Sequence, residues 1–277
     1  MGHVVADVAH TFAANRAVGS IALAVRASAG ATRRSRVREE GPLRVRCPGP
    51  ASAELEAVIV NTAGGVAGGD RFALGVTVEA CARLVVTTAA AEKVYRTLAP
   101  EATIDVKLDV ATGGALAWLP QETILFDRAR LERTIEVDLA ADAEFLMAEA
   151  VVFGRAGMGE VVGAGSLLDR RRVRRGGKLV HAETTRLEGD LAGKLAQAAV
   201  ARGGIAVASV LAVPADEAIA AAVREASRQC CGEVGISAWN GFAVMRLVAS
   251  DGATLRHDLA CVLATLRGGR RLPHWLL

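Results

Sequence analysis

Aromatic residues are scarce in this chain of 277 residues: they make up 4% of it, whereas hydrophobic residues make up 52%. Any core must therefore be filled mainly by small and branched side chains. Proteins that bind single-stranded nucleic acid stack bases on aromatic rings, and no basic stretch here has aromatics interleaved with it. The formal net charge is only +3, so the overall field does not favour nucleic acid either.

The sequence contains few cysteines, and their number is odd. Because the count is odd and no CxxC spacing occurs, the pattern favours a reducing, cytoplasmic setting over a disulfide scaffold. The five residues are Cys47, Cys81, Cys230, Cys231 and Cys261. No apolar run reaches about 18 residues, and the first 20 residues do not resemble a signal peptide. We therefore expect a cytoplasmic protein without a membrane span.

The histidines offer no recognisable metal motif. They have neither HxH nor HExxH spacing, and none pairs with a cysteine at zinc-finger spacing, so we expect no tightly bound metal or other cofactor. The five are His3, His10, His181, His257 and His274. A GxSxG elbow is also missing, and no serine or cysteine stands in a triad context, so the sequence gives little support to nucleophilic catalysis.

Several carboxylates sit inside apolar stretches, and Glu149 within residues 145–153 is the clearest. Burying a carboxylate costs several kcal/mol unless it is paired or faces water or a cation. Arg155 lies just beyond in the sequence and is one candidate partner. A structural ion pair and a polar conduit through the protein are both consistent with this pattern.

The glycine-rich stretch at residues 61–70, NTAGGVAGGD, follows an apolar run and at first resembles a phosphate-binding loop. A P-loop would end in Gly-Lys-Ser/Thr, and a dinucleotide fingerprint would be followed by a helix. Here Asp70 closes the loop, and the next residues have the pattern of a strand. We expect the paired glycines to allow close backbone approach, with Asp70 presented at a narrow place.

Period-two alternation marks strands, for example at residues 103–110 and 134–139. Units of strand, short turn and strand recur at roughly 30-residue spacing, which predicts stacked β layers. The turns begin after Val78, Val110, Leu139 and Val173. A run of plain hairpins in a sandwich is an equal alternative. The arginine-rich run at residues 169–178 falls on the last unit, and its two readings are a solvated hairpin and a surface for an acidic protein.

After residue 188 helical patterns begin. We expect helices opening at Leu191 and at Asp216, the second with Asp216 as its N-cap, and a third over residues 255–266 that ends at Gly268. Strands are expected at residues 205–213 and 242–248. The sequence thus predicts a mainly β protein of stacked, β-helix-like layers with two or three α-helices in its C-terminal third. We expect one domain, residues 1–277, with a β-rich body to about 188 and a mixed part over 189–277.

Several motifs occur in a recognisable order. They are EGPL at residues 40–43, the glycine loop, TTAAAEKVYR at 87–96, WLPQETILF at 118–126, and Glu149 followed by Gly154-Arg155 and Gly159-Glu160. Together they resemble the urease accessory protein UreD family, called UreH in some organisms. The resemblance is strongest over residues 36–190.

The resemblance implies a maturation factor for urease that is not an enzyme, with a β-helical body. It implies binding to a UreF-type partner that recruits a UreG-type GTPase, docking on apo-urease, and a dimer within the accessory complex. It further implies that nickel(II) passes in transit through an internal tunnel with acidic residues. By motif the metal-path residues are Asp70 and Glu149, with Arg155 nearby, and Glu183 as a weaker match. A docking scaffold that never handles nickel is the alternative.

Overall fold

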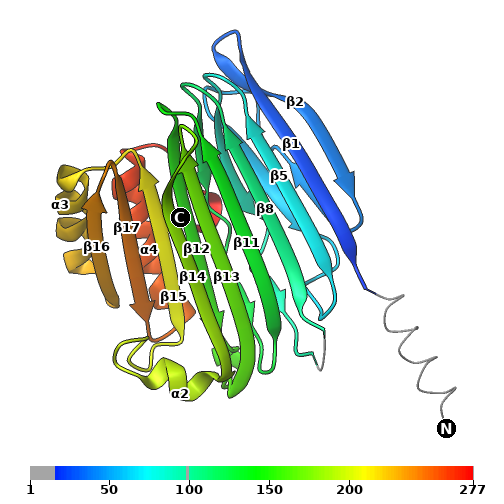
Figure 1. Ribbon diagram of the computed structural model, residues 1–277, viewed down its shortest axis with the longest axis vertical. Coiled ribbons are helices and arrows are strands. Elements are labelled where there is room, and N and C mark those ends of the chain that lie inside the picture. The colour runs from blue at the N-terminus through cyan, green and yellow to red at the C-terminus, as the bar shows by residue number, and fades with distance from the viewer. Residues whose placement is uncertain (1–15, 98–99, 277) are drawn as a thin grey trace, which may run out of the picture.

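The computed structural model describes residues 16–97 and 100–276, and its main feature is two β-sheets packed face to face (Figure 1). The first sheet, sheet A, runs in spatial order through β14 (Lys178–Asp190), β13 (Ala164–Arg175), β11 (Arg130–Leu139), β8 (Ala102–Val110), β5 (Arg71–Val78), β1 (Val18–Ser28) and β2 (Ala31–Glu40). Its five middle strands are parallel and its two edge strands are antiparallel to their neighbours.

Sheet B lies behind sheet A and extends further on one side. Its order is β16 (Glu233–Trp239), β17 (Phe242–Ala249), β15 (Ala206–Val213), β12 (Glu144–Phe153), β9 (Ala115–Trp118), β6 (Arg83–Thr88), β4 (Leu55–Asn61) and β3 (Leu43–Arg46). Two short strands, β7 (Glu92–Val94) and β10 (Thr123–Leu125), continue the sheet beside the second half of β12.

The predicted stacked layers are confirmed. The turns after Val78, Val110 and Leu139 each carry the chain from sheet A to sheet B, so successive units lie side by side as parallel rungs, as in a β-solenoid. The turn after Val173 differs, because it joins β13 to β14 as an antiparallel hairpin within sheet A. The first three units are therefore stacked layers, and only the last unit is a hairpin, which is the arrangement that the alternative interpretation predicted for all four.

Two hydrophobic layers result from the alternation along the strands. One lies between the sheets and contains Leu131, Ile135 and Val137 of β11. The other lies between sheet B and the C-terminal helices and contains Leu255 and Leu259. Because most of these side chains are Val, Leu, Ile and Ala, the core is built from small pieces, as the shortage of aromatics requires.

The three predicted helices are present in the C-terminal third. They are α2 (Leu191–Ala196), α3 (Glu217–Ala226) and α4 (Gly252–Arg267), accompanied by the 3₁₀ turns η1 (Ala156–Met158), η2 (Ser227–Gln229) and η3 (His274–Leu276). Asp216 caps α3 by accepting a hydrogen bond from the backbone N–H of Ile219, and Gly268 ends α4 in the left-handed conformation, both as predicted. Strand β16 was not predicted.

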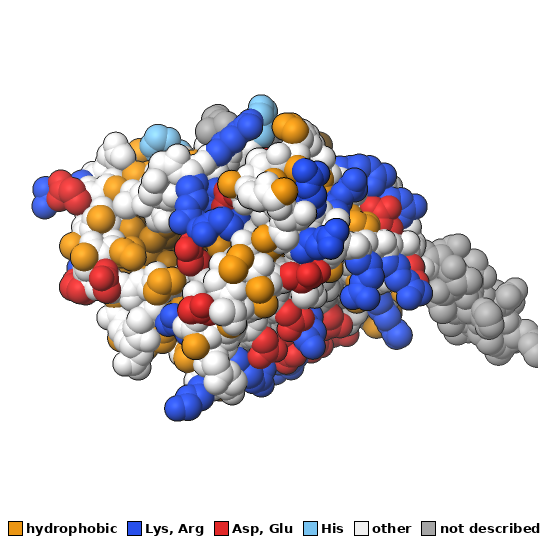
Figure 2. Space-filling view, turned by 90° about the horizontal axis from the view of Figure 1, so that it is seen from above, with side chains coloured by type: hydrophobic (Ala, Val, Ile, Leu, Met, Phe, Trp, Pro, Cys, Tyr) orange, Lys and Arg blue, Asp and Glu red, His pale blue; other side chains and the backbone are white. Residues whose placement is uncertain are grey.

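The end of the sandwich that carries the turns after Val78, Val110 and Leu139 has two different halves to its surface (Figure 2). Arginines crowd the side of β1 and β2, and hydrophobic side chains gather on the opposite side. The exposed hydrophobic residues in the chain include Leu179 at the start of β14 and Trp239 at the end of β16. Within the described residues, no helix is long and apolar enough to cross a membrane.

Candidate functional site

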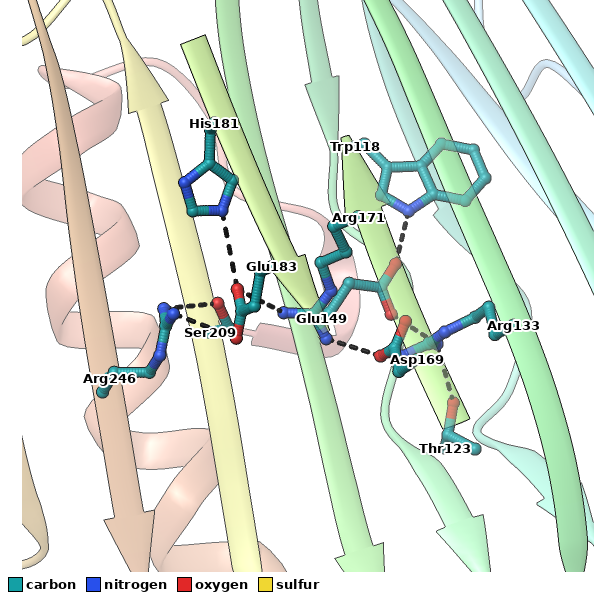
Figure 3. A network of polar contacts seen from close by, with 10 residues as sticks. All are labelled: Trp118, Thr123, Arg133, Glu149, Asp169, Arg171, His181, Glu183, Ser209 and Arg246. Atoms are coloured by element: carbon teal, nitrogen blue, oxygen red, sulfur yellow. Dashed lines mark hydrogen bonds and ion pairs between the residues drawn. The ribbon is translucent and has the colours of Figure 1, made fainter. Parts of the chain in front are cut away.

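A belt of charged side chains crosses the interior between the sheets, and Glu149 is its innermost carboxylate (Figure 3). Glu149 is on β12 between Met147 and Val151, which face the layer between the sheets, so its side chain points the same way. It is 3% exposed. One oxygen accepts a hydrogen bond from the indole N–H of Trp118 at 2.6 Å, and the other lies 2.6 Å from a guanidinium nitrogen of Arg133.

The belt continues along sheet A because parallel pairing places charged residues side by side. Arg133 on β11 is the register partner of Asp169 on β13, and their side chains meet at 2.5 Å. Arg171, two residues further on β13, also bonds Asp169, at 2.6 Å. Arg171 is in turn the register partner of Glu183 on β14, with their charged atoms 3.6 Å apart.

Sheet B supplies a second row opposite the first. Glu149, Ser209 and Arg246 are aligned in register across β12, β15 and β17. Arg246 donates to Ser209 at 2.8 Å and pairs with Glu183 at 2.9 Å, while His181 lies 3.5 Å from Glu183. The side chain of Arg246 is 46% exposed, so the belt runs from the interior to the open side of the sandwich beside β14.

The charges in the belt support one another. Burial opposes ionisation of Asp169, but Arg133 and Arg171 outweigh it and lower the pKa of this carboxyl to about 2. Burial likewise opposes the charge of Arg133, and Asp169 and Glu149 raise its pKa above the usual value. For Glu183, His181 and the two neighbouring arginines overcome burial and lower the pKa. The shifts of Arg133, Asp169 and Glu183 all favour their charged forms, inside a mainly apolar core.

A cavity of about 70 Å³ lies at the inner end of the belt. Its polar lining residues include Thr88, Glu92, Thr123, Arg133 and Glu149. That volume is enough for several water molecules, since one water needs only about 10–15 Å³ on this measure. Glu92 receives hydrogen bonds from Asn61 at 3.1 and 3.3 Å. Burial raises the pKa of Glu92 to about 7, and the charge of Asp70 adds to that rise.

Asp70 itself, 4% exposed, anchors the glycine loop. Its two oxygens accept hydrogen bonds from the backbone N–H groups of Ala17 at 2.8 Å and Ala67 at 2.7 Å. The expected close backbone approach is present at Gly68, where an added Cβ would lie 2.0 Å from Thr97 Oγ1 and 2.6 Å from the Pro100 carbonyl oxygen. Asp70 is thus held away from the belt and acts on it through the charge it places near Glu92.

Arg155, the partner expected for Glu149, was the wrong arginine. Its guanidinium pairs with Glu160 at 2.9 Å and lies over the ring of Phe126, 4.1 Å from the centroid. It is on the loop that follows β12, whereas Glu149 points between the sheets. Arg133 is the actual partner. Extending the alternation of β11 back from residue 134 places Arg133 on the inward face with Leu131 and Ile135, although it does not show that Glu149 lies opposite.

The arginine-rich run, which was interpreted as a solvated hairpin or as a surface for an acidic protein, does form a hairpin, but two of its charged residues are buried. Asp169 is 2% exposed and Arg171 is 5% exposed, because both occupy inward positions of β13 between Leu167 and Val173. Arg170, on the opposite face, pairs with Glu132 instead. The period-two alternation of Leu167, Asp169, Arg171 and Val173 indicated which residues face inward, but the many charged residues in the run hid that pattern.

Among the described residues, no group of three or more His, Cys, Asp or Glu side chains is arranged to hold a metal ion. Two of the histidines considered above, His3 and His10, lie outside those residues. Burial first, and then the charge of Asp258, raise the pKa of Cys230 to about 12, which makes this thiol a poor metal ligand near neutral pH. The carboxylates of the belt are therefore the main groups that could meet a cation inside the protein.

Comparison with known proteins identifies the family of this chain. Residues 17–274 match the family model described as UreD urease accessory protein. The chain is 57% identical over 267 residues to the urease accessory protein UreD of Rhodopseudomonas palustris strain CGA009, covering 96% of this chain and 95% of that protein. It is 54% identical over 266 residues to the protein of that name in Bradyrhizobium diazoefficiens, covering 96% of each. The chain belongs to the UreD urease accessory protein family.

Proposed function

We propose that this chain is a non-enzymatic urease maturation factor of the cytoplasm that acts as a scaffold and as a nickel-transfer chaperone. It would dock on apo-urease together with UreF-type and UreG-type accessory proteins, as a dimer within that complex, and nickel(II) would pass through its interior in transit. Membership of the UreD family supports the role in urease maturation. The route through the interior rests on the geometry of the belt.

The observation that supports a route is the continuity of carboxylates from the cavity to the open side. Glu92 and Glu149 line the cavity, Asp169 follows, and Glu183 lies beside the half-exposed Arg246. In this proposal Asp70 fixes the loop beside the inner end, and Glu183 stands at the outer end. Arg155 belongs to the loop surface and has no part in the path.

Sparse carboxylates suit a metal in transit. Imidazole and thiolate ligands bind nickel(II) strongly, so a cluster of them would retain the ion. A conducting path needs binding that is favourable enough to admit the ion and weak enough to release it. Single carboxylates separated by guanidinium groups and water meet both requirements.

The test is to replace Glu149 and Glu183 by Gln, one at a time, and to measure nickel-dependent urease activation together with assembly of the accessory complex. We expect each variant to assemble but to activate urease several-fold less. Glu188→Gln is the matched control, because Glu188 is on the same strand as Glu183 and is exposed. Normal activation by both interior variants, with assembly intact, would contradict the path.

A docking scaffold without nickel handling is the second candidate, and one observation favours it. Glu149 already has Trp118 and Arg133 as partners, so the belt also satisfies itself as a structural network. This candidate predicts that the interior variants lower activation only in proportion to lost assembly. Plotting activation against the amount of assembled complex for each variant separates the two.

A further inference from the structure

We propose that the guanidinium of Arg133 occupies a divalent-cation position between Glu149 and Asp169, and that it moves across Thr123 to Glu92 when a cation takes that position. The inference rests on the proposed path and specifies how a path filled by an arginine could admit an ion. It assigns roles to Arg133, Asp169, Thr123 and Glu92.

The position is already filled by a cation, the Arg133 guanidinium, which lies between two carboxylates. The Arg133 nitrogens lie 2.6 Å from Glu149 and 2.5 Å from Asp169, with the three side chains almost fully buried. Nη1 meets Glu149 and Nη2 meets Asp169, and two carboxylates on either side of one group in a low-dielectric interior need a positive charge between them. A guanidinium and a hydrated divalent ion are alternative ways of supplying it.

An unused acceptor indicates that the guanidinium does not complete the site. Asp169 Oδ1 is buried and has no hydrogen-bond partner among the residues that the structure describes, although Oδ2 of the same carboxylate accepts from two arginines. Buried polar atoms without partners are uncommon in native proteins and often mark a functional group or an absent ligand. A divalent ion with its water shell could use this second oxygen, because carboxylates bind such ions through one or both oxygens.

A second anchor for the guanidinium lies close by. Arg133 Nη1 is 3.4 Å from Thr123 Oγ1, and Thr123 is the register partner of Glu92 on the neighbouring strand β7. Because side chains in register on adjacent strands point to the same face, Glu92 lies next to Thr123 and lines the same cavity as Arg133. A rotation of the arginine side chain into the cavity would exchange one carboxylate partner for another without exposing the charge.

The two arrangements explain two separate features. Glu92 is a partly buried carboxyl that, among the described residues, receives hydrogen bonds from the neutral amide of Asn61 and has no cationic partner, so it can accept one. The cavity supplies the free space that a side-chain rotation needs in an otherwise close-packed core. Arg133 would then be a positioning residue that closes the path to monovalent ions and yields to a doubly charged one.

The first test replaces the movable charge by an apolar stem of similar length. Arg133→Met leaves Glu149 and Asp169 facing each other, so its melting temperature should fall and should recover with Ni²⁺ but not with the same concentration of Na⁺. We expect the Ni²⁺-induced rise in melting temperature to be several-fold larger than in the unaltered full chain. The double variant Arg133→Met with Glu149→Gln is the control and should lose that rise. An equal response in all three proteins would overturn the inference.

The second test keeps Arg133 and removes its proposed second anchor. Glu92→Gln preserves size and the contact with Asn61, so folding should not depend on it. We expect equilibrium dialysis of the full chain against Ni²⁺ to show about tenfold weaker binding than the unaltered protein, since the displaced guanidinium would have no anionic partner. Glu188→Gln should bind as the unaltered protein does. Unchanged binding by Glu92→Gln would contradict the proposal even if Arg133→Met fails to fold.

Different results would contradict the nickel path and the movement of Arg133. If Glu149→Gln loses urease activation while Glu92→Gln binds Ni²⁺ normally, the path stands and the movement of Arg133 is wrong. If Glu149→Gln activates urease normally with the complex assembled, the path itself is wrong, and the inference falls with it.

Discussion

Trp118 on β9 donates its indole N–H to Glu149 on β12 over 2.6 Å, in a part of the interior where Glu149 is 3% exposed. Trp118→Phe keeps the aromatic packing and removes the donor, so it should lower the free energy of unfolding by about 1–3 kcal/mol, the cost of an unsatisfied buried acceptor. Trp275→Phe is the matched control, because its indole bonds Thr87 at a partly exposed site. Urea denaturation followed by circular dichroism measures both, and an equal loss in the two variants would contradict the special role of the buried bond.

Asp169 should make the protein sensitive to acid. Its pKa is lowered from 3.8 to about 2, so the stability due to its ionised form is fully present above about pH 4 and is lost as the pH falls towards 2. Asp169→Asn should cost about 3–5 kcal/mol at neutral pH, because it breaks a buried charge network. The urea midpoint of the variant should also change less between pH 5 and 2.5 than that of the unaltered protein. Asp105→Asn, at an exposed position of β8, should leave the profile unchanged.

The ionisation of Glu92 should lower the stability of the protein as the pH rises, whereas Asp169 lowers it as the pH falls. Its pKa is raised from 4.5 to about 7, so the folded state disfavours the ionised form, and stability falls as the pH rises from about 4.5 to about 7. Glu92→Gln removes this fall. The free energy of unfolding, measured from pH 5 to 8, should therefore decline for the unaltered protein and stay nearly level for the variant. The advantage of the variant over the unaltered protein should be greatest at pH 8. Parallel profiles would show that Glu92 titrates normally.

Gly68 should tolerate no side chain. An added Cβ would lie 2.0 Å from Thr97 Oγ1 and 2.6 Å from a backbone oxygen, so Gly68→Ala must displace the loop that Asp70 anchors. We expect a loss of more than about 1 kcal/mol, since overpacking typically costs 1–3 kcal/mol. Gly235→Ala is the control, because its added Cβ would meet no other atom within 4 Å in the described part of the chain, its two chain neighbours aside. Thermal unfolding of the two variants should differ clearly, and similar melting temperatures would argue against close approach at Gly68.

Local sequence signals predicted the elements of the fold well where each signal is self-contained. The caps at Asp216 and Gly268 and the alternation in β8 and β11 depend on neighbouring residues only, and all were confirmed. The direction of the turns could not be predicted in the same way. The sequence pattern assigned the same spacing to the turns after Leu139 and Val173, but four residues join the two sheets between Leu139 and Glu144. Strand β13 instead continues to Arg175, and only Gly176 and Gly177 separate it from Lys178, a loop length typical of a hairpin.

The candidate site was predictable by residue type but not by partner. Glu149 stood out as a carboxylate in an apolar strand, and its burial is confirmed. Its pairing with Arg133 depends on how two sheets face each other, which no local pattern encodes. Asp169 and Arg133 meet because their strands are parallel and in register, a relationship between positions that lie 36 residues apart in the chain.

The belt also has a consequence for synthesis on the ribosome. Its members lie on strands that emerge in turn, from Trp118 on β9 to Arg246 on β17, and the last of them follows about nine-tenths of the way along the chain. Until β17 adds to the sheet, Glu183 lacks one of its cationic partners and the open side of the sandwich is incomplete. A nascent or truncated chain that ends before Arg246 would have the two arginines Arg133 and Arg171 against the three belt carboxylates, so only a chain that includes β17 balances them with a third arginine.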